Sequence, residues 1–326
     1  VLEFLYGKFI YKKENIKNEQ LLKEVLSDLS VVENYHDLIK KFFCQYAVMD
    51  WLIVRYGIKA MFITNAYTNM GYVLACKKNN CKVVEFQHGI VNSTHYAYNV
   101  YKDFGRMLYP DYLLVFGNKE RDIFTKENYL IKSEKVISVG NFYIDYILQD
   151  VNSRQTEFGE LTNSYNRTVA VAMQDAFEQQ IIEFVKETAS IDPDIAYVLM
   201  PRSKTHEYYR IFDLPDNVLF CNKLNSYEII KECDFHSTMT STTAIEAPSL
   251  GTRNILMNID NMAKEYYEEI LRKPVTTFAD TPTAMIQLIN NAEPLTRKEI
   301  LMSNNDIIAE GFRDNLTKVI KDIFDD

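Results

Sequence analysis

The 326-residue sequence predicts an α/β fold with two domains, each built on a parallel sheet. Short apolar runs that suit buried strands alternate with longer segments of helical periodicity along most of the chain. The alternation is interrupted by a polar, aperiodic stretch at 150–166 and then starts again. Chains of this length usually form two domains. We therefore expect an N-terminal domain over 1–150 and a C-terminal domain over 151–326.

The N-terminal half is expected to be helical up to residue 57 and to alternate after it. Apolar spacing predicts helices over 19–29 and 35–56. Further on, we expect strands at 59–64, 82–86, 112–116 and 135–139, and helices at 65–80 and 119–128. The chain starts at Val1 in a partly apolar segment without Met, which suggests an N-terminally trimmed sequence.

The C-terminal half repeats this alternation. We expect strands at 168–172, 196–200, 218–221, 234–236, 254–257 and 275–278. The helices are expected at 177–188, 226–231, 241–250, 263–271, 283–291 and 306–324. Ligands of open parallel sheets bind beyond the carboxyl ends of the strands, so residues that follow a strand are the candidates for function.

The composition excludes several classes of protein. Asp and Glu total 45 against 36 Lys and Arg, so a general nucleic-acid binder is not expected. The five cysteines form no Cys-x-x-Cys pair, so neither a zinc ribbon nor a disulfide framework is indicated, and a cytoplasmic setting fits best. No apolar run reaches the ~18–20 residues of a membrane span. Peripheral contact with the inner face of the plasma membrane is a further expectation, based on Lys8, Phe9, Tyr11, Lys12 and Lys13.

The segment 234–258 carries the strongest signal for a ligand. Glu246 follows a predicted strand and a run of hydroxyl residues, and Gly251 ends the predicted helix. The hydroxyl residues are Ser237, Thr238, Thr240, Ser241, Thr242 and Thr243. Backbone N–H groups at a helix start attract phosphate, and a carboxylate one turn further on suits the two hydroxyls of a ribose. The alternative is a helix start with more capping residues than it needs, because Ser and Thr are common caps.

Two motifs carry a resemblance to known proteins. EAPSLG at 246–251, after the Ser/Thr-rich turn and before NILM, resembles the nucleotide-binding motif of bacterial UDP-N-acetylglucosamine 2-epimerases. VGNFYIDY at 139–146 is similar to the segment that leads into the second domain of that family. Both also resemble the GT-B superfamily, which includes many glycosyltransferases. The resemblance implies two Rossmann-like domains facing across a cleft, with Glu246 at the ribose and Ser241, Thr242 and Thr243 near the diphosphate.

A second candidate site follows the strand at 82–86. Gln87, His88 and Gly89 come directly after it; histidine suits proton transfer near neutral pH, and glycine permits close approach to the backbone. This Gln-His-Gly string resembles the N-terminal domains of glycosyltransferases that build bacterial capsules and surface polysaccharides. A histidine that only hydrogen-bonds across a turn is the alternative. The expected acceptor-side residues are Asn65, Tyr67, Gln87, Gly89 and His95, with Tyr96, Tyr98 and Tyr101 as candidates for sugar stacking.

A third candidate follows the strand at 196–200. Arg202, Lys204 and His206 form a local basic cluster in an acidic protein, and a sugar nucleotide is an anion. A solvated basic loop is the alternative. Many GT-B proteins have a His-Pro or Pro-x-His string near this point, and this chain departs from that pattern.

The resemblance therefore favours a glycosyltransferase over an epimerase, because the nucleotide motif matches better than the catalytic residues do. We expect transfer from a nucleotide-sugar donor to a hydroxyl of a bacterial surface glycan or lipid-linked glycan, with His88 as base. Neither a metal ion nor a cofactor is expected, because GT-B transferases generally need none and no Asp-x-Asp string follows a strand. The alternatives are a CDP-polyol phosphotransferase, a nucleotide-sugar 2-epimerase and a non-catalytic module that binds nucleotide sugar or glycan.

Overall fold

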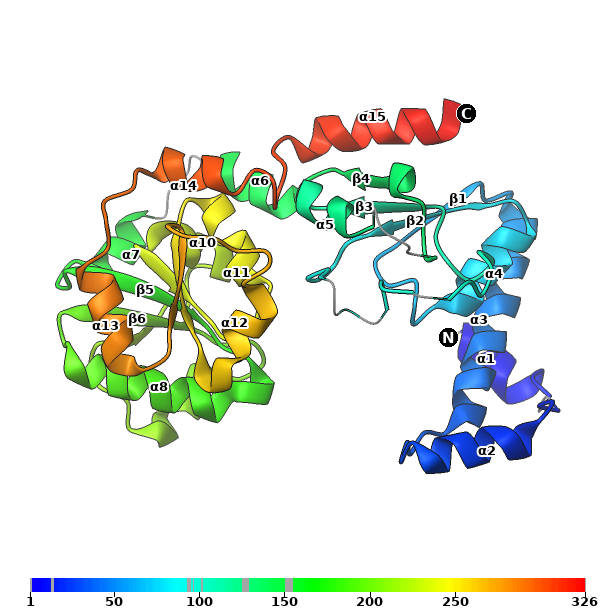
Figure 1. Cartoon of the computed structure of the whole chain (residues 1–326), viewed down its shortest axis with the longest axis horizontal. Coiled ribbons are helices and arrows are strands. Elements are labelled where there is room, and N and C mark those ends of the chain that lie inside the picture. Colours follow the sequence, from blue (N-terminus) through cyan, green and yellow to red (C-terminus); the bar gives the residue numbers. More distant parts are fainter. Residues whose placement is uncertain are drawn as a thin grey trace. The chain divides into compact units, whose positions relative to one another are not determined.

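A computed structural model describes residues 2–12, 15–92, 95, 97–100, 102–124, 129–149 and 155–325. The chain forms two compact units, each with its own parallel sheet (Figure 1). The first unit is Val1–Val115 with Arg121–Ile137, and the second is Phe116–Glu120 with Ser138–Asp326. The prediction of an α/β fold with two Rossmann-like domains is confirmed. Residues 138–149, which we assigned to the N-terminal domain, lie in the second unit. The expected cleft stays a prediction.

The first unit is a four-stranded sheet with strands in sequence order. The strands are β1 (Ala60–Ile63), β2 (Lys82–Phe86), β3 (Tyr112–Val115) and β4 (Val136–Ser138). β2 pairs in parallel with both β1 and β3. The helices of this part of the chain are α1 (Leu2–Phe9), α2 (Glu19–Asp28), α3 (Tyr35–Tyr56), α4 (Met70–Lys78), α5 (Asn118–Ile123) and the 3₁₀ turn η1 (Ser133–Lys135). α3 packs on α4, which follows β1 and precedes β2.

The second unit is a six-stranded parallel sheet whose order changes direction at its centre. The strands are β5 (Arg167–Ala172), β6 (Ile195–Met200), β7 (Val218–Phe220), β8 (Phe235–Ser237), β9 (Arg253–Met257) and β10 (Thr276–Ala279). Their order is β10-β9-β8-β5-β6-β7. Along the chain, β6 and β7 are added on one side of β5. The chain then returns, and β8, β9 and β10 are added on the other side of β5. Such a reversal leaves a crevice at the carboxyl ends of the two central strands, where ligands of this architecture bind.

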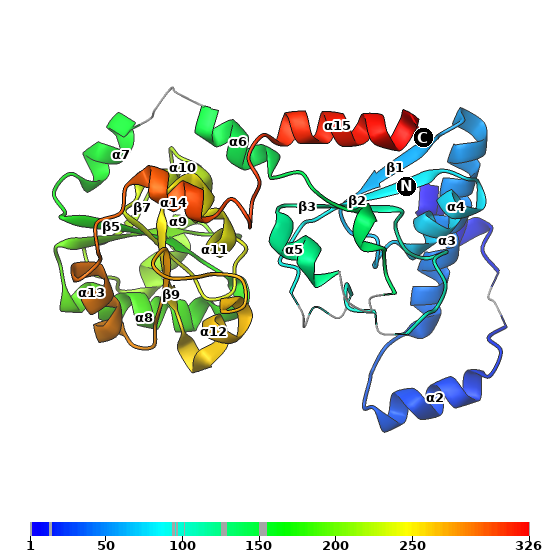
Figure 2. The same ribbon diagram turned by 45° about the horizontal axis from the view of Figure 1, so that its top comes forward.

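Helices cover both faces of this second sheet (Figure 2). One face carries α8 (Glu178–Ile191) and α13 (Pro282–Asn290), which pack on each other. The other carries α10 (Ser226–Glu232) with its neighbours α6 (Phe142–Gln149) and α7 (Gln155–Thr162). Each face has its own cluster of buried apolar side chains. The remaining elements are α9 (His206–Tyr209), α11 (Thr243–Glu246), α12 (Met262–Tyr267), α14 (Arg297–Ser303), α15 (Phe312–Asp325), and the 3₁₀ turns η2 (Asp175–Phe177), η3 (Arg210–Phe212), η4 (Pro248–Leu250) and η5 (Ile259–Asn261).

Three expectations about individual elements were wrong. The polar stretch at 150–166 contains the helix α7, whose buried Phe158 packs into the core beside α10. The helix expected at 241–250 is a single α-helical turn, α11, followed by η4, because Pro248 has no N–H to continue the α-helical pattern. The last helix begins at Phe312 rather than at 306, because Gly311 has a positive φ of 80° just before it.

Two glycines allow backbone segments to meet where the chain passes from one unit to the other. The Phe116 carbonyl accepts hydrogen bonds from the N–H of Gly140 at 3.1 Å and of Ala309 at 2.9 Å. Gly140 has a φ of 90°, and a side chain there would collide with the Ala309 carbonyl. A side chain at Gly117 would collide with the backbone of Asp306 and Ile307. Residues 116–117, 138–140 and 306–309 are therefore packed backbone to backbone.

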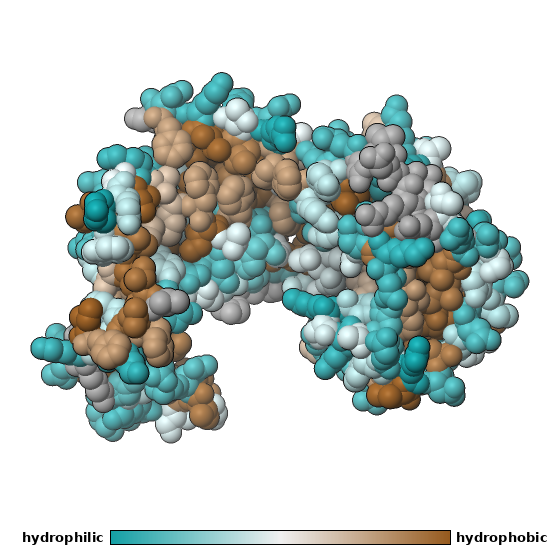
Figure 3. All heavy atoms as spheres, turned by 180° about the vertical axis from the view of Figure 1, so that it is seen from behind, coloured by the Kyte–Doolittle hydropathy of each residue, from teal (hydrophilic) through white to brown (hydrophobic). Residues whose placement is uncertain are grey.

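The N-terminal helices leave apolar side chains exposed, as Figure 3 shows over this part of the first unit. α1 and α3 line an apolar hollow of about 510 Å³ with Leu2, Leu5, Tyr6, Phe9, Ile10, Ala47, Val48 and Trp51. Lys8 lies over the rings of Phe4 and Phe9, whereas Lys13 of the expected basic cluster is outside the described residues. Among the residues that the structure describes, no helix combines the length and apolar character that crossing a bilayer requires.

Candidate functional site

The Ser/Thr-rich turn lies at the central reversal of the second sheet. It follows β8, and the residues after the neighbouring strand β5 hold it in place. The Gln174 side-chain oxygen accepts from the Thr240 N–H at 2.8 Å, and its amide donates to the Thr240 hydroxyl at 2.9 Å. The Thr238 hydroxyl donates to the Ala172 carbonyl at 3.1 Å. Gln174 was not among the predicted site residues, although it follows the strand predicted at 168–172 and residues that follow a strand were the candidates for function.

The predicted hydroxyl residues have different surroundings. The Ser241 hydroxyl accepts from the Thr243 N–H at 3.3 Å, which supports the capping alternative for this residue. The Thr242 side chain makes no capping hydrogen bond. The hydroxyls of Thr243 and Ser237 are buried and have no hydrogen-bond partner. Buried polar atoms are almost always hydrogen-bonded, so two unpartnered hydroxyls, one at the end of β8 and one at the start of α11, are a reason to expect a ligand or water there.

Glu246 is a buried carboxylate with one oxygen occupied and one free. The residue is 4% exposed. Its Oε1 accepts from the Tyr227 hydroxyl at 2.8 Å and from the Asn141 amide at 3.4 Å, whereas Oε2 is buried without a partner. Burial raises the pKa of Glu246 from its ordinary 4.5 to about 7, and the Tyr227 hydrogen bond opposes that rise. The carboxyl group is therefore able to accept two further hydrogen bonds.

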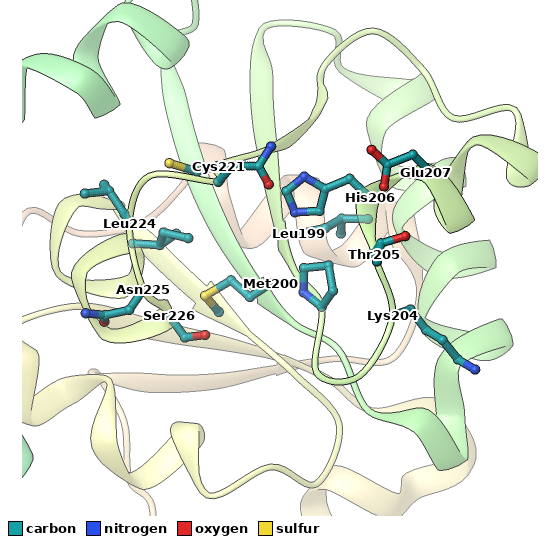
Figure 4. Close-up of a pocket in the computed structure, with 13 residues that line it drawn as sticks. Leu199, Met200, Lys204, Thr205, His206, Glu207, Cys221, Leu224, Asn225 and Ser226 are labelled. Atoms are coloured by element: carbon teal, nitrogen blue, oxygen red, sulfur yellow. The ribbon is translucent and has the colours of Figure 1, made fainter.

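A pocket of about 450 Å³ opens at the carboxyl ends of β6 and β7 (Figure 4). Its lining residues are Leu199, Met200, Pro201, Lys204, Thr205, His206, Glu207, Cys221, Asn222, Leu224, Asn225, Ser226 and Ile229. Lys204 and His206 of the predicted basic cluster are thus brought together at one pocket. Arg202 is exposed and is not among the lining residues. The His206 ring packs on Phe220, with ring centres 4.8 Å apart.

The helix α10 links this pocket to Glu246. Asn225 and Ser226 at its start line the pocket, and the next residue, Tyr227, donates to Glu246. A capping box fixes the helix start: the Asn225 side chain accepts from the Tyr227 and Glu228 N–H groups, and the Glu228 carboxylate accepts from the Asn225 N–H. The start of α10 thus contributes to the pocket through Asn225 and Ser226 and to the environment of Glu246 through Tyr227. Tyr227 was not among the predicted site residues, and Asn141 was noted only as part of the string at 139–146, with no role given to it.

The first unit has a separate polar cluster at the carboxyl end of β2. Glu85 is 1% exposed and accepts from the Ala66 N–H at 3.2 Å and the Tyr98 hydroxyl at 3.0 Å. Burial raises the pKa of its carboxyl group. Glu85 lines a cavity of about 230 Å³ that is otherwise mainly apolar and includes Tyr67 and Tyr98. We did not include Glu85 among the candidate site residues, because it lies inside the predicted strand at 82–86 and our criterion took only residues that follow a strand.

The structure gathers only some of the expected acceptor-side residues. The Tyr67 ring is near both His88 and His95, with its centre 6.1 Å from the centre of each. Partial burial lowers the pKa of both histidines, and for His88 the nearby His95 lowers it further, which favours the neutral form of both rings.

The other expected acceptor-side residues serve local turns or lie outside the description. The Asn65 side chain accepts from the Thr68 N–H and hydroxyl, and the Gln87 amide donates to the Gly89 carbonyl at 2.8 Å. Tyr96 and Tyr101 lie outside the described residues. Over the described part of the chain, no group of three His, Cys, Asp or Glu side chains is arranged to hold a metal ion, and the expectation of metal independence stays a prediction.

Comparison with solved structures confirms the fold class. UDP-GlcNAc 2-epimerase from Neisseria meningitidis, solved with UDP-GlcNAc, has a TM-score of 0.60 and 13% identity over 95% of this chain and 90% of its own. The enzyme from Methanocaldococcus jannaschii, with UDP-GlcNAc and UDP, gives 0.60 and 12% over 92% and 88%. The calicheamicin glycosyltransferase CalG4 gives 0.57 and 11% over 97% and 83%. At these identities the likeness establishes a shared GT-B-like fold.

Sequence comparison adds nothing to this. No protein-family model matches the chain, and no curated protein matches it either.

Proposed function

We propose that this chain is a glycosyltransferase that binds the nucleotide of a nucleotide-sugar donor in its second unit. The observation that carries the proposal is the free Oε2 of buried Glu246 at the central reversal of the sheet. An ionised carboxylate without a partner is costly inside a protein, and a ribose diol offers the two donors that would satisfy it. The shared fold supports this proposal, because the Neisseria and Methanocaldococcus structures hold UDP-sugar.

The surrounding groups fit the rest of a donor nucleotide. Lys204 and His206 line a pocket large enough for a nucleobase and phosphates; the Lys204 ammonium group points away from the pocket in Figure 4 and would have to turn inward to meet a phosphate. The unpartnered hydroxyl of Thr243 lies one helical turn before Glu246, on the same side of α11. As the bond from the anomeric carbon to the diphosphate breaks, hydroxyl and cationic groups stabilise the departing charge. In this scheme Glu246 anchors the ribose and takes no part in bond cleavage.

For the acceptor, we propose that His88 removes the proton of the attacking hydroxyl. Its neutral imidazole is the form that accepts a proton, and it is exposed at the carboxyl end of β2. The acceptor oxygen then bonds to the anomeric carbon as the nucleotide diphosphate leaves. The acceptor class that we propose is a bacterial surface glycan or its lipid-linked precursor.

A second candidate function is epimerisation of a nucleotide sugar at C2. The observation that favours it is Glu85, a buried carboxylate with a raised pKa that lines a cavity of the first unit. A buried carboxyl group with a raised pKa is a candidate for proton exchange with a substrate. The epimerases with this fold also make this the nearest alternative.

One experiment separates the two. UDP-GlcNAc and further UDP-, CDP-, CMP- and GDP-sugars are incubated with the protein in D₂O, with and without bacterial surface oligosaccharides. Transferase activity predicts nucleotide release that rises with the oligosaccharides and a mass increase of these acceptors. Deuterium at C2 of UDP-GlcNAc without any acceptor would instead establish the epimerase. Nucleotide binding without either reaction would leave a binding module.

A further inference from the structure

The two groups that hold Glu246 come from separate elements and occupy the same carboxylate oxygen. Tyr227 belongs to α10, and Asn141 directly precedes α6. Both reach Oε1, at 2.8 Å and 3.4 Å, and neither reaches Oε2. A carboxylate rotates easily about its last bond, so two fixed donors on one oxygen set the direction of the other.

We propose that Tyr227 and Asn141 are positioning residues that aim Oε2 of Glu246 at a ribose diol, and that the site therefore selects ribonucleotides over 2′-deoxyribonucleotides. This inference rests on the proposed function and adds to it the sugar specificity and the residues that enforce it.

Tyr227 is itself held in place from two sides. The capping box of Asn225 and Glu228 fixes the first turn of α10. The Tyr143 ring of α6 packs edge-on against the Tyr227 ring, with centres 5.0 Å apart. Because the capping box fixes the Tyr227 backbone and Tyr143 packs against its ring, the Tyr227 hydroxyl is held in one place. Tyr227 directly follows Ser226, which lines the pocket at the carboxyl ends of β6 and β7.

The orientation of the Asn141 amide follows from its other contacts. Its side-chain oxygen accepts from the N–H of Tyr143 at 2.9 Å and of Ile144 at 3.4 Å, at the start of α6. The amide nitrogen therefore points away from these donors and toward Glu246. The same side chain both caps a helix and donates to the carboxylate.

The chemistry of the free oxygen explains the expected selectivity. A ribose offers adjacent 2′- and 3′-hydroxyls, whereas a 2′-deoxyribose offers only the 3′-hydroxyl. Losing one hydrogen bond to a buried carboxylate weakens binding by about tenfold or more. Selection follows only while Oε2 keeps its direction, so a loosened carboxylate should bind both sugars more equally.

The pH dependence gives a readout that a purely structural role would leave unchanged. The titratable groups around Glu246 are tyrosines: Tyr227 of α10, backed by Tyr143 of α6, and Tyr267 of α12. No ion pair to Glu246 is present in the described parts of the chain. Hydroxyl donors bind the ionised carboxylate, so affinity should fall as pH falls through the pKa of about 7. Without the Tyr227 hydroxyl, that midpoint should move to higher pH.

The test is calorimetric titration of the whole chain with UDP, CDP and GDP and with their 2′-deoxy counterparts, from pH 6 to 9. The variants are Tyr227→Phe, Asn141→Ser, which keeps a helix-capping oxygen but loses the amide donor, and Tyr146→Phe as the matched control on α6. We expect about tenfold or greater preference for the ribonucleotide in the native protein. Both site variants should reduce it at least threefold, and Tyr227→Phe should raise the pH midpoint.

The outcomes separate this inference from the proposed function. If the native protein binds no nucleotide, the proposed function fails and this inference fails with it. If it binds ribo- and deoxyribonucleotides equally, only the sugar specificity fails. If it prefers ribonucleotides and both site variants keep that preference and midpoint, the positioning role is overturned. Should Tyr227→Phe fail to fold, as judged by circular dichroism, Asn141→Ser alone decides the positioning role through its ribose preference.

Discussion

The Gln174 side chain makes two hydrogen bonds to a single residue, Thr240, through its oxygen at 2.8 Å and its nitrogen at 2.9 Å. This pair joins the carboxyl ends of β5 and β8, the two strands at which the sheet order reverses. It thereby sets the path of the turn that leads to Glu246. These hydrogen bonds hold the turn and do not themselves contact a ligand, so the effect of Gln174 on binding should be indirect.

Replacing Gln174 with Ala should loosen the turn and weaken nucleotide binding. Three partly buried hydrogen bonds are lost, two with Thr240 and one from the Thr238 hydroxyl, which should lower the free energy of unfolding by about 1–3 kcal/mol and the affinity several-fold. Urea unfolding and calorimetric titration measure the two effects. Gln179→Ala, on the exposed side of α8, is the control, and equal results for both variants would show that the turn needs no such support.

Glu246 should make the ligand-free protein less stable at high pH. Its pKa is raised from 4.5 to about 7, so the folded chain retains a proton that the unfolded chain has released between these pH values. Stability is therefore lost as pH rises through this window. We expect Glu246→Gln to add about 2 kcal/mol more to the free energy of unfolding at pH 8 than at pH 5.5. Denaturant titrations at both pH values test this, and an equal effect at both would contradict the raised pKa.

Cys221 should report whether the pocket is occupied. Four of the five cysteines are buried, and Cys221, which lines the pocket, is the partly exposed one. A maleimide should label the native protein once, at Cys221, and a bound nucleotide should slow that reaction at least fivefold. Peptide mass spectrometry locates the label, and protein in urea, which should take five labels, is the control. Labelling at an unchanged rate in saturating nucleotide would place the ligand elsewhere.

Lys204 and Arg202 should differ, although both follow the same strand. Both side chains are exposed, but Lys204 lines the pocket and Arg202 does not. Lys204→Ala should weaken nucleotide diphosphate binding by about three- to tenfold, most strongly at low salt, because an exposed charge is screened as salt rises. Arg202→Ala should have a smaller effect, and Arg210→Ala, on η3, serves as the control. Similar losses for Lys204→Ala and Arg210→Ala would indicate only a general charge effect.

His88 should be needed for turnover and not for donor binding. His88→Gln should reduce transfer by about 10²–10⁴-fold, the usual contribution of a positioned base, with little change in nucleotide affinity. Because partial burial and His95 lower its pKa, activity should persist below the ordinary histidine pKa and fall only at more acidic pH. His36→Gln, on α3, is the control. Full turnover of His88→Gln would exclude His88 as the base and leave His95 or Glu85 as the candidate.

The sequence predicted most strands because a buried parallel strand is a short apolar run. The strand at 82–86 was placed with its observed bounds, and Glu246 was selected as a candidate from its position after the hydroxyl run. α14 and α7 were missed because they are short and only partly buried, which gives their periodicity little contrast. Periodicity of apolar residues reports burial only for residues that are close together in the sequence.

The partners of Glu246 were missed for a different reason. Asn141 lies 105 positions from Glu246 in the sequence and Tyr227 lies 19 positions away. Tyr227 is on the first turn of a helix, so a search of residues that follow strands passes over it. The asymmetry between Oε1 and Oε2 depends on side-chain geometry, which no sequence pattern reports. The need for glycine at 117 and 140 likewise comes from the backbone of 306–309, which is distant in the sequence.

Nucleotide binding at Glu246 is tested most directly by thermal shift. The native protein and Glu246→Gln are compared at pH 8 with UDP, CDP, CMP and GDP. A ligand that binds only the folded state raises the melting temperature. We predict that one base series stabilises the native protein and that Glu246→Gln, itself at least as stable without ligand, loses this response, whereas the exposed control Glu187→Gln keeps it. An equal shift in the native protein and Glu246→Gln, or none in either, would contradict the assignment of Glu246 to a nucleotide site.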